Sequence, residues 1–432
     1  MGLLPEPETP SLPSIISTVV PATSRGDKNP TFNLTYMDLL LKLHYIRPVY
    51  FFTSEAVQGL TTSDLKKPMF PLLDTYSHVS GRIRRSESGR PFIKCNDAGV
   101  RIAESHCEKT LREWFDEKKG LDYCAEGLVH DHVLGPDVNF SPLLFVKFTW
   151  FKCGGLSIGL SWAHVLGDAF SAFNFITKWS QILAGHAPPK SLHKPIPIES
   201  EFPPNQNITD ENPISIKMAR VVGEYWLGAN DSDVATHTFH FTSNQLQRLV
   251  TASSKSKNSY FEIISAMLLK HIAHIRGEFG KRVVTICTNN NSGREANEVP
   301  NNGLVFSKVE ADLESDISEL ARLIAEKKMI ENHIMEKLVE KDEGKEDFIV
   351  YGANLTFVDL EEAEIYGVKL NGHKPIVANC TFRGVGDQGV VLVLPAAPED
   401  NDGDNGRIAT VSLPEKELNK LKDKLGEALS VL

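Results

Sequence analysis

The sequence lacks both a long apolar run and an excess of positive charge. The nearest approach to a membrane helix, residues 37–52, is interrupted by Asp38, Lys42, His44, Arg47 and Pro48, whereas a spanning helix needs about 18 to 20 apolar residues. The formal net charge is -10, and nucleic-acid binding requires clustered Lys and Arg. We therefore expect no transmembrane segment and no nucleic-acid partner.

Several motifs of known chemistry are also missing. The six cysteines include no C-x-x-C pair, which indicates neither a zinc site nor a disulfide framework, so we expect reduced and mostly buried thiols. The N-terminus has neither the basic nor the apolar region of a secretory signal. There is no G-x-S-x-G elbow, Walker loop, H-E-x-x-H motif or dinucleotide fingerprint, and we expect no metal and no cofactor.

Length and composition indicate a folded chain with more than one domain. The 432 residues are 41% apolar and 24% charged, a balance typical of globular proteins, and this length predicts about two to three domains. Residues 186–215 contain seven prolines and are typical of a crossover linker. We predict an N-terminal domain at 1–185, this linker, and a C-terminal domain at 216–432.

Periodicity predicts mixed α/β structure in both halves. Alternating or β-branched runs predict strands at 143–151, 156–162, 236–242, 282–288, 303–309, 389–394 and 407–413. Helical spacing predicts helices at 169–183, 316–341 and 415–432, and a further helix that begins after a capping box formed by Ser259 and Glu262. The glycines within 383–386 predict a hairpin turn.

Two interpretations of the segment SWAHVLGDAF, residues 161–170, are open. In the first, Asp168 caps a helix and His164 is an ordinary turn histidine. In the second, the His164 ring faces a cleft and takes a proton from an acceptor hydroxyl or amine, while Asp168 fixes the turn. The spacing His-x-x-x-Asp arises about once by chance in a chain of this composition, so the context has to decide.

The order of several segments resembles the BAHD family of plant CoA-dependent acyltransferases. The segments are VVPA with TYMDLLLKLHY, YSHVSGRIRR, IKCNDAGVRIAE, SPLLFVKFTWFKCGGLSIGLSWAHVLGD, NSYFEIISAMLLKHI and GVVLVLP, and they extend over almost the whole chain. The resemblance implies an α/β fold of two chloramphenicol-acetyltransferase-like mixed-sheet domains with a channel at their interface. It also implies that His164 is the general base, that Asp168 is its structural support and that Arg294 pairs with Asp168.

Two departures from the family pattern suggest a particular branch. Ala169 stands where the family usually has glycine, which narrows the backbone freedom of the turn. The second family signature, Asp-Phe-Gly-Trp-Gly, is missing from residues 354–375, where Tyr366 and Gly367 are only a faint echo of it. Together with MDLLLKLHYIRPVYFF, DHVLGPDVNFSPLLF, VGEYWL and YGANLTFVDL, this absence resembles the eceriferum and Glossy wax proteins.

The resemblance to this branch implies a role in fatty acid elongation for cuticular wax. The resemblance implies that the protein acts together with a ketoacyl-CoA synthase, the condensing enzyme of the endoplasmic-reticulum elongase. Together they would extend acyl chains beyond about 28 carbons. We expect acyl-CoA as substrate or ligand, a monomer, and residence at the cytosolic face of the endoplasmic reticulum by association, or in the cytoplasm. The alternative is an active acyltransferase that moves an acyl group from CoA to an alcohol or amine.

A further candidate site concerns the phosphates of CoA. Lys255 and Lys257 lie just before the helix cap at Ser259, and a basic loop beside a helix N-terminus is suited to phosphate. An exposed basic loop without a ligand is the competing interpretation.

Overall fold

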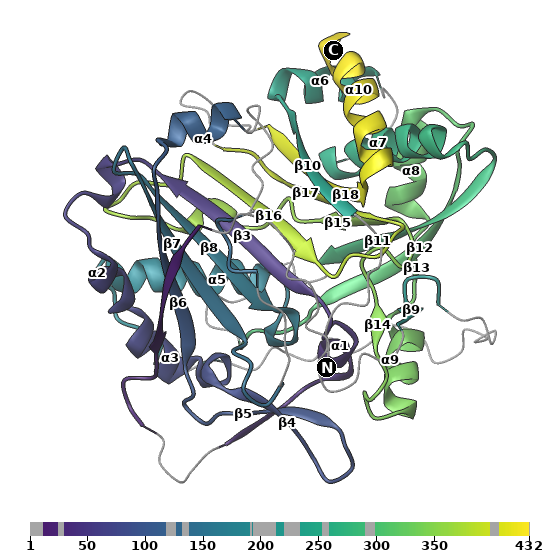
Figure 1. Ribbon diagram of the computed structural model, residues 1–432. Coiled ribbons are helices and arrows are strands. Elements are labelled where there is room, and N and C mark those ends of the chain that lie inside the picture. The colour runs from purple at the N-terminus through teal and green to yellow at the C-terminus, as the bar shows by residue number, and fades with distance from the viewer. Residues whose placement is uncertain are drawn as a thin grey trace, which may run out of the picture.

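The computed structural model has a mixed α/β architecture built around two large sheets (Figure 1). It describes residues 12–24, 30–117, 127–131, 138–190, 192, 213–219, 234–252, 259–289, 299–397 and 406–431. None of the helices in these ranges combines the length and the apolar character needed to cross a bilayer.

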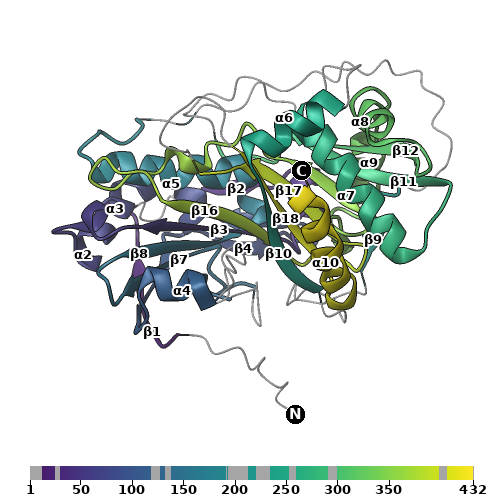
Figure 2. The same cartoon turned by 90° about the horizontal axis from the view of Figure 1, so that it is seen from above.

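The first sheet is six-stranded and mixed, in the order β1-β6-β7-β8-β3-β16. Its strands are β1 (Ser14–Val19), β3 (Tyr45–Phe52), β6 (Val100–Cys107), β7 (Leu144–Phe151), β8 (Leu156–Ala163) and β16 (Val377–Arg383). Only the β6 and β7 pair is parallel among these neighbours. The helix α5 (Ala169–Leu183) lies along one face of this sheet (Figure 2).

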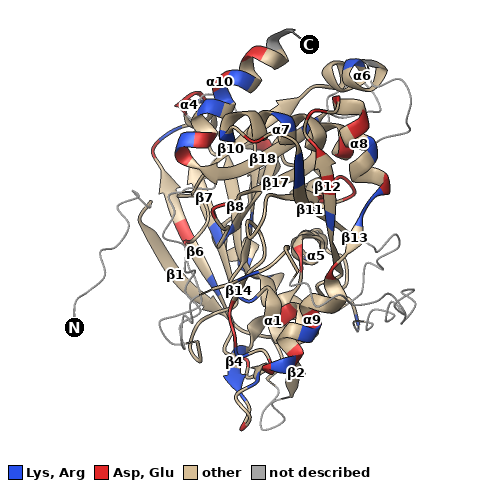
Figure 3. Ribbon diagram, turned by 90° about the vertical axis from the view of Figure 1, so that its right-hand side faces the viewer, with Lys and Arg blue, Asp and Glu red and all other residues tan. Residues whose placement is uncertain are grey.

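The second sheet is seven-stranded and comes entirely from the second half of the sequence, in the order β10-β18-β17-β15-β11-β12-β13. Its strands are β10 (Val234–Phe241), β11 (Lys281–Asn289), β12 (Leu304–Asp312), β13 (Met329–Ile330), β15 (Thr356–Asp359), β17 (Val390–Pro395) and β18 (Arg407–Pro414). The helices associated with it are α6 (Ser243–Ala252), α7 (Tyr260–Arg276), α8 (Ile317–Glu326) and α10 (Glu415–Val431). On α8, Arg322 pairs with Glu319 and Glu326, and Figure 3 shows how both signs of charge mix on this helical layer.

Smaller elements complete the fold. Two short sheets contain β2 (Thr31–Asn33), β4 (Arg82–Arg85) and β5 (Pro91–Lys94), and β9 (Lys217–Met218) with β14 (Phe348–Ile349). The remaining α-helices of the described ranges are α1 (Tyr36–Leu40), α2 (Thr62–Lys66), α3 (Met69–Thr75), α4 (Leu111–Glu117) and α9 (Asn332–Lys341).

Strand β16 connects the two large sheets. It comes from the second half of the chain but pairs with β3 of the first sheet, while the next strand, β17, pairs with β15 and β18 of the second sheet. The predicted hairpin at 383–386 is therefore wrong, because the flanking strands belong to different sheets. The buried amide of Asn379 on β16 donates to Thr238 Oγ1 at 2.8 Å and accepts from Thr410 Oγ1 at 2.7 Å, which links the sheets.

Most predicted elements are present, and a second correction concerns residues 316–341. The strands predicted around 143–151 and 156–162 are β7 and β8, and the helix that follows them is α5. The single helix predicted over 316–341 is wrong: α8 ends at Glu326, β13 pairs with β12, and α9 begins at Asn332. No proline or glycine breaks this stretch; pairing with a neighbouring strand overrides the local helical preference.

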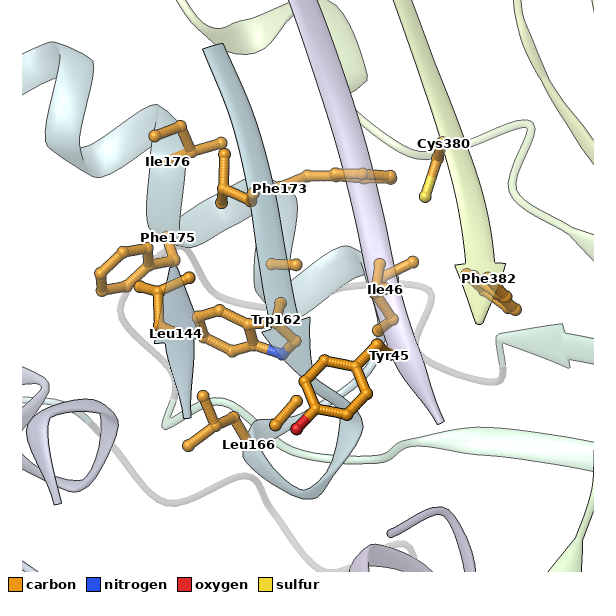
Figure 4. Packing of buried hydrophobic residues seen from close by; sticks show 14 of the residues in the cluster. Tyr45, Ile46, Leu144, Trp162, Leu166, Phe173, Phe175, Ile176, Cys380 and Phe382 are labelled. Carbon is orange, nitrogen blue, oxygen red and sulfur yellow. The ribbon is translucent and has the colours of Figure 1, made fainter. Parts of the chain in front are cut away.

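The hydrophobic core crosses from the first sheet into the second half of the chain. Its largest cluster joins Trp162 of β8 and Phe173 of α5 with Phe382 of β16, and Figure 4 shows these rings with their neighbours. Full burial of one large apolar side chain contributes about 1.5 to 3 kcal/mol. The core therefore fixes β8 and the start of α5, which carry the His164 turn.

Candidate functional site

The turn that carries His164 and Asp168 joins β8 to α5. His164–Leu166 form one 3-10 turn, and Gly167 follows with φ 135°. A Cβ atom at Gly167 would lie 2.8 Å from the backbone nitrogen of Asn301, so the turn requires glycine here on grounds of both space and dihedral angle. The Trp162 indole nitrogen donates to the Gly167 carbonyl at 2.9 Å and holds the turn against the core.

Asp168 is the N-cap of α5 and has no exposed surface. Its Oδ1 accepts from the Ser171 backbone N–H at 3.1 Å, and its Oδ2 accepts from the Gly303 N–H at 3.2 Å. Its own N–H donates to the Asn301 carbonyl at 3.1 Å. Asp168 therefore fixes the start of the helix and ties the turn to residues 301–303, which is the geometry of the helix-cap interpretation.

Ala169 does not strain the turn. It is the first residue of α5 and is buried, so it adopts a helical backbone conformation that alanine favours. The conformation that requires glycine falls two residues earlier, at Gly167. The departure from the family pattern at position 169 therefore leaves the local geometry intact.

The acid–base interpretation expects the His164 ring to face an open cleft, but the ring is buried. It has no exposed surface, and its Nε2 lies 3.0 Å from the Tyr351 hydroxyl. The rings of Tyr351, Phe382 and His44 surround it, with centroid separations of 5.6, 6.1 and 6.5 Å. Among the described residues, these three rings therefore pack around the His164 imidazole.

Burial also sets the protonation state of the ring. Desolvation lowers the pKa of His164 to about 4, against the opposing effects of the Asp168 charge, its own carbonyl and the Asn302 side chain. Desolvation and the neighbouring His164 likewise lower the pKa of His44 to about 3, against the opposing effect of the Arg383 carbonyl. Both rings are therefore neutral near pH 7.

Two residues that position the turn were not predicted. The His44 carbonyl accepts from the His164 N–H at 3.1 Å, and Asn302 Nδ2 donates to the His164 carbonyl at 2.9 Å and to Asp38 Oδ1 at 2.8 Å. Burial raises the pKa of Asp38 to about 6. No sequence pattern near His44 or Asn302 indicates this role, because only the fold brings these two residues close to His164.

Residues 354–375, where the family's second signature is missing, still pack against helix α5. Residues Ile365–Gly367 form a 3-10 turn, and Tyr366 accepts at its hydroxyl from the Ala378 N–H at 3.2 Å. A Cβ atom at Gly367 would lie 2.9 Å from Thr177 Oγ1 of α5. Tyr366 and Gly367 therefore connect α5 to β16 although the signature is absent.

The candidate CoA residues are only partly described. Lys255, Lys257 and the predicted Asp168 partner Arg294 lie outside the described residues. Ser259 is the N-cap of α7 and forms the predicted capping box, in which the Glu262 carboxylate accepts from the Ser259 N–H at 2.6 Å. The structure thus brings His164 and Asp168 together in one turn and engages Ser259 in its own helix cap.

A surface pocket lies far from His164. It has a volume of about 540 Å³ and includes Thr53, Ser54, Phe115 and Ile376 in its lining. Thr53 follows the end of β3, whereas His44 precedes its start, and the eight residues between them span about 26 Å at 3.3 Å per residue. This pocket is therefore at the opposite end of the strand from the candidate base.

Comparisons with known proteins agree on the family. A sequence model described as the Transferase family matches residues 14–428. The chain is 43% identical over 425 residues to Protein ECERIFERUM 2 of Arabidopsis thaliana, covering 95% of this chain and 96% of that protein. It is 36% identical over 429 residues to Protein ECERIFERUM 26-like of the same plant, covering 98% and 97%.

Solved structures show the same fold at low sequence identity. Vinorine synthase superposes with a TM-score of 0.67 at 19% identity, covering 95% of this chain and 96% of that chain. F. graminearum TRI101 complexed with ethyl coenzyme A gives 0.68 at 13% identity, covering 91% and 97%. The predicted α/β fold of two chloramphenicol-acetyltransferase-like mixed-sheet domains is confirmed. The chain belongs to the transferase family of BAHD acyltransferases, in the branch of its ECERIFERUM relatives.

Proposed function

We propose that this protein acts in very-long-chain fatty acid elongation for cuticular wax and does so without proton transfer at His164. It works with a ketoacyl-CoA synthase of the endoplasmic reticulum to extend acyl chains beyond about 28 carbons. The observation that carries the mechanistic part is the fully buried His164 ring, whose Nε2 is occupied by the Tyr351 hydroxyl at 3.0 Å.

The geometry makes His164 a poor general base. A base must lie within hydrogen-bond reach of the proton that it removes, and here a hydroxyl of the protein itself, that of Tyr351, lies 3.0 Å from Nε2. A general base is most effective when its pKa is near the working pH, whereas burial lowers the pKa of His164 to about 4. Access and basicity therefore both oppose acyl transfer in this conformation.

The comparisons support the biological part of the proposal. Three relatives that match nearly the whole chain carry the ECERIFERUM name, whereas Hydroxycinnamoyltransferase of Narcissus pseudonarcissus matches 34% of this chain at 30% identity. A structure with the same fold is complexed with ethyl coenzyme A. We propose acyl-CoA as the ligand, and a monomer held at the cytosolic face of the endoplasmic reticulum by the condensing enzyme.

An active acyltransferase is the second candidate. It is favoured by the intact turn, in which Asp168 still accepts from the Ser171 and Gly303 backbone groups. That function requires displacement of Tyr351 from His164, followed by attack of an alcohol or amine on the thioester with release of CoA.

The test is a product-chain-length assay in a host that expresses a matching ketoacyl-CoA synthase. The variants are His164→Ala, and His106→Ala as a control at a histidine whose side chain is 70% exposed. We expect both to retain the wild-type distribution of very-long-chain products within about twofold, after correction for protein level, because no proton moves at His164. Loss of the longest products in His164→Ala alone, at normal protein level, would contradict the proposal.

A further inference from the structure

The Tyr351 hydroxyl lies where an acceptor hydroxyl would have to bind. A general base accepts the proton of its substrate at about 2.6 to 3.2 Å between heavy atoms, and the Tyr351 oxygen lies 3.0 Å from His164 Nε2. The two rings are stacked, with an interplanar angle of 30°. The phenol thus occupies both the hydrogen-bonding position and the space in front of the base.

The backbone that carries Tyr351 is fixed on both sides. The Val350 N–H donates to His44 Nε2 at 3.0 Å, and the Gly386 N–H donates to the Tyr351 carbonyl at 2.8 Å. Gly352 has φ 82°, and a Cβ atom there would lie 2.5 Å from the Gly386 carbonyl oxygen. Only glycine fits this conformation and this contact, so the position of Tyr351 is built into the chain.

Aromatic rings from both sheets enclose the Tyr351 side chain. Its ring centroid lies 4.6 Å from Phe382 on β16, 4.9 Å from His44 beside β3, and 6.0 Å from Phe306 on β12. These separations are within the range of favourable aromatic pairs, and Tyr351 has no exposed surface. The phenol is therefore held at the junction of the sheets and is not a freely moving surface side chain.

We propose that Tyr351 is an intramolecular acceptor mimic that closes the His164 site to alcohol and amine acceptors. It is a specificity-determining residue, since its hydroxyl satisfies the base and its ring fills the acceptor volume. The inference rests on the proposed function, because a closed base explains why elongation proceeds without acyl transfer at His164. Removal of the phenol side chain should leave a cavity that His164 Nε2 faces, which is suited to a small phenol.

The first test measures access to His164 in the full-length protein with diethyl pyrocarbonate, which modifies neutral imidazole. Rates at each histidine are followed by mass spectrometry, with His106 as the exposed reference. We expect wild-type His164 to react at least 100-fold more slowly than His106, and Tyr351→Ala to accelerate it at least tenfold. Because the pKa of His164 is about 4, its ring is neutral at pH 7. A slow reaction at pH 7 therefore shows that the reagent cannot reach the ring, and not that the ring is protonated.

Controls separate access from general loosening of the fold. Tyr351→Phe keeps the ring and should leave His164 protected. Tyr76→Ala removes another fully buried ring, which packs against Phe175 and His78, and should also leave it protected. If Tyr351→Ala does not fold, Tyr351→Leu takes its place. Wild-type His164 that reacts as fast as His106, or a folded Tyr351→Ala in which His164 stays protected, would overturn the proposal.

A second test uses phenol as the probe. Phenol should raise the melting temperature of Tyr351→Ala more than toluene does, and it should leave the wild type unchanged, because only the variant has the cavity. Equal effects of phenol and toluene would contradict a hydrogen bond to His164. A protected His164 combined with loss of elongation in His164→Ala would refute the proposed function and leave the role of Tyr351 standing.

Discussion

Removal of the Asp168 carboxylate should destabilise the fold far more than removal of an ordinary helix cap. Asp168→Ala deprives α5 of its N-cap bond to Ser171, worth about 1 kcal/mol. It also removes the carboxylate oxygen that accepts from the partly buried Gly303 N–H, and loss of the partner of a buried donor costs about 1 to 3 kcal/mol. The expected loss in unfolding free energy is therefore about 2 to 4 kcal/mol.

The matched control is Asp316, an exposed residue that caps α8 through one bond of 2.8 Å to the Glu319 N–H. Asp316→Ala should cost about 0.5 to 1 kcal/mol, because water replaces the lost acceptor. Urea unfolding followed by tryptophan fluorescence compares the two variants with the wild type. Equal losses in the two variants would refute the view that Asp168 also ties the turn to residues 301–303.

Two further predictions concern buried charge. Because burial lowers the pKa of His164 to about 4, the folded protein binds fewer protons than the unfolded chain between about pH 6.5 and 4, and stability falls as the pH falls through that window. His164→Asn should lose less stability over the same window in urea titrations; identical losses would contradict the burial of a neutral ring. Lys42 Nζ lies 3.1 Å from Asp347 Oδ1, and both side chains are buried. Asp347→Ala should lower the free energy of unfolding by about 3 to 5 kcal/mol, because it removes the counter-charge of a buried ammonium group whose remaining partners include the Gly344 carbonyl, and adding Lys42→Met should restore part of this loss. If the double variant Lys42→Met/Asp347→Ala is less stable than Asp347→Ala alone, the prediction of a buried, paired charge is contradicted.

Local patterns predicted much of the fold around the site. Apolar alternation gave β7 and β8, helical spacing gave α5, and the pairing of Ser259 with Glu262 gave the start of α7. In each case the signal lies within a few residues of the element that it predicts. The helix cap at Asp168, one of the two interpretations that the sequence left open, rests on a signal of the same kind, because an N-cap acts on the turn that follows it.

Long-range contacts could not be predicted in this way. Tyr351 is 187 residues from His164 in the sequence, and no spacing rule connects the two. The break between α8 and α9 depends on β12, to which β13 pairs, and on Glu331, whose buried carboxylate accepts from the Ser215 N–H at 3.1 Å. The crossing of β16 between the sheets likewise depends on partners that only the folded chain supplies.

The measurement that tests the central claim most directly is CoA release by the purified full-length protein. Long-chain acyl-CoA is mixed with a panel of alcohols and amines, and free thiol is followed for the wild type and for His164→Ala. With His164 closed by Tyr351, both proteins should release CoA at the rate seen without an acceptor. Acceptor-dependent release by the wild type that disappears in His164→Ala would contradict the account, because it would show that the base still receives the acceptor's proton.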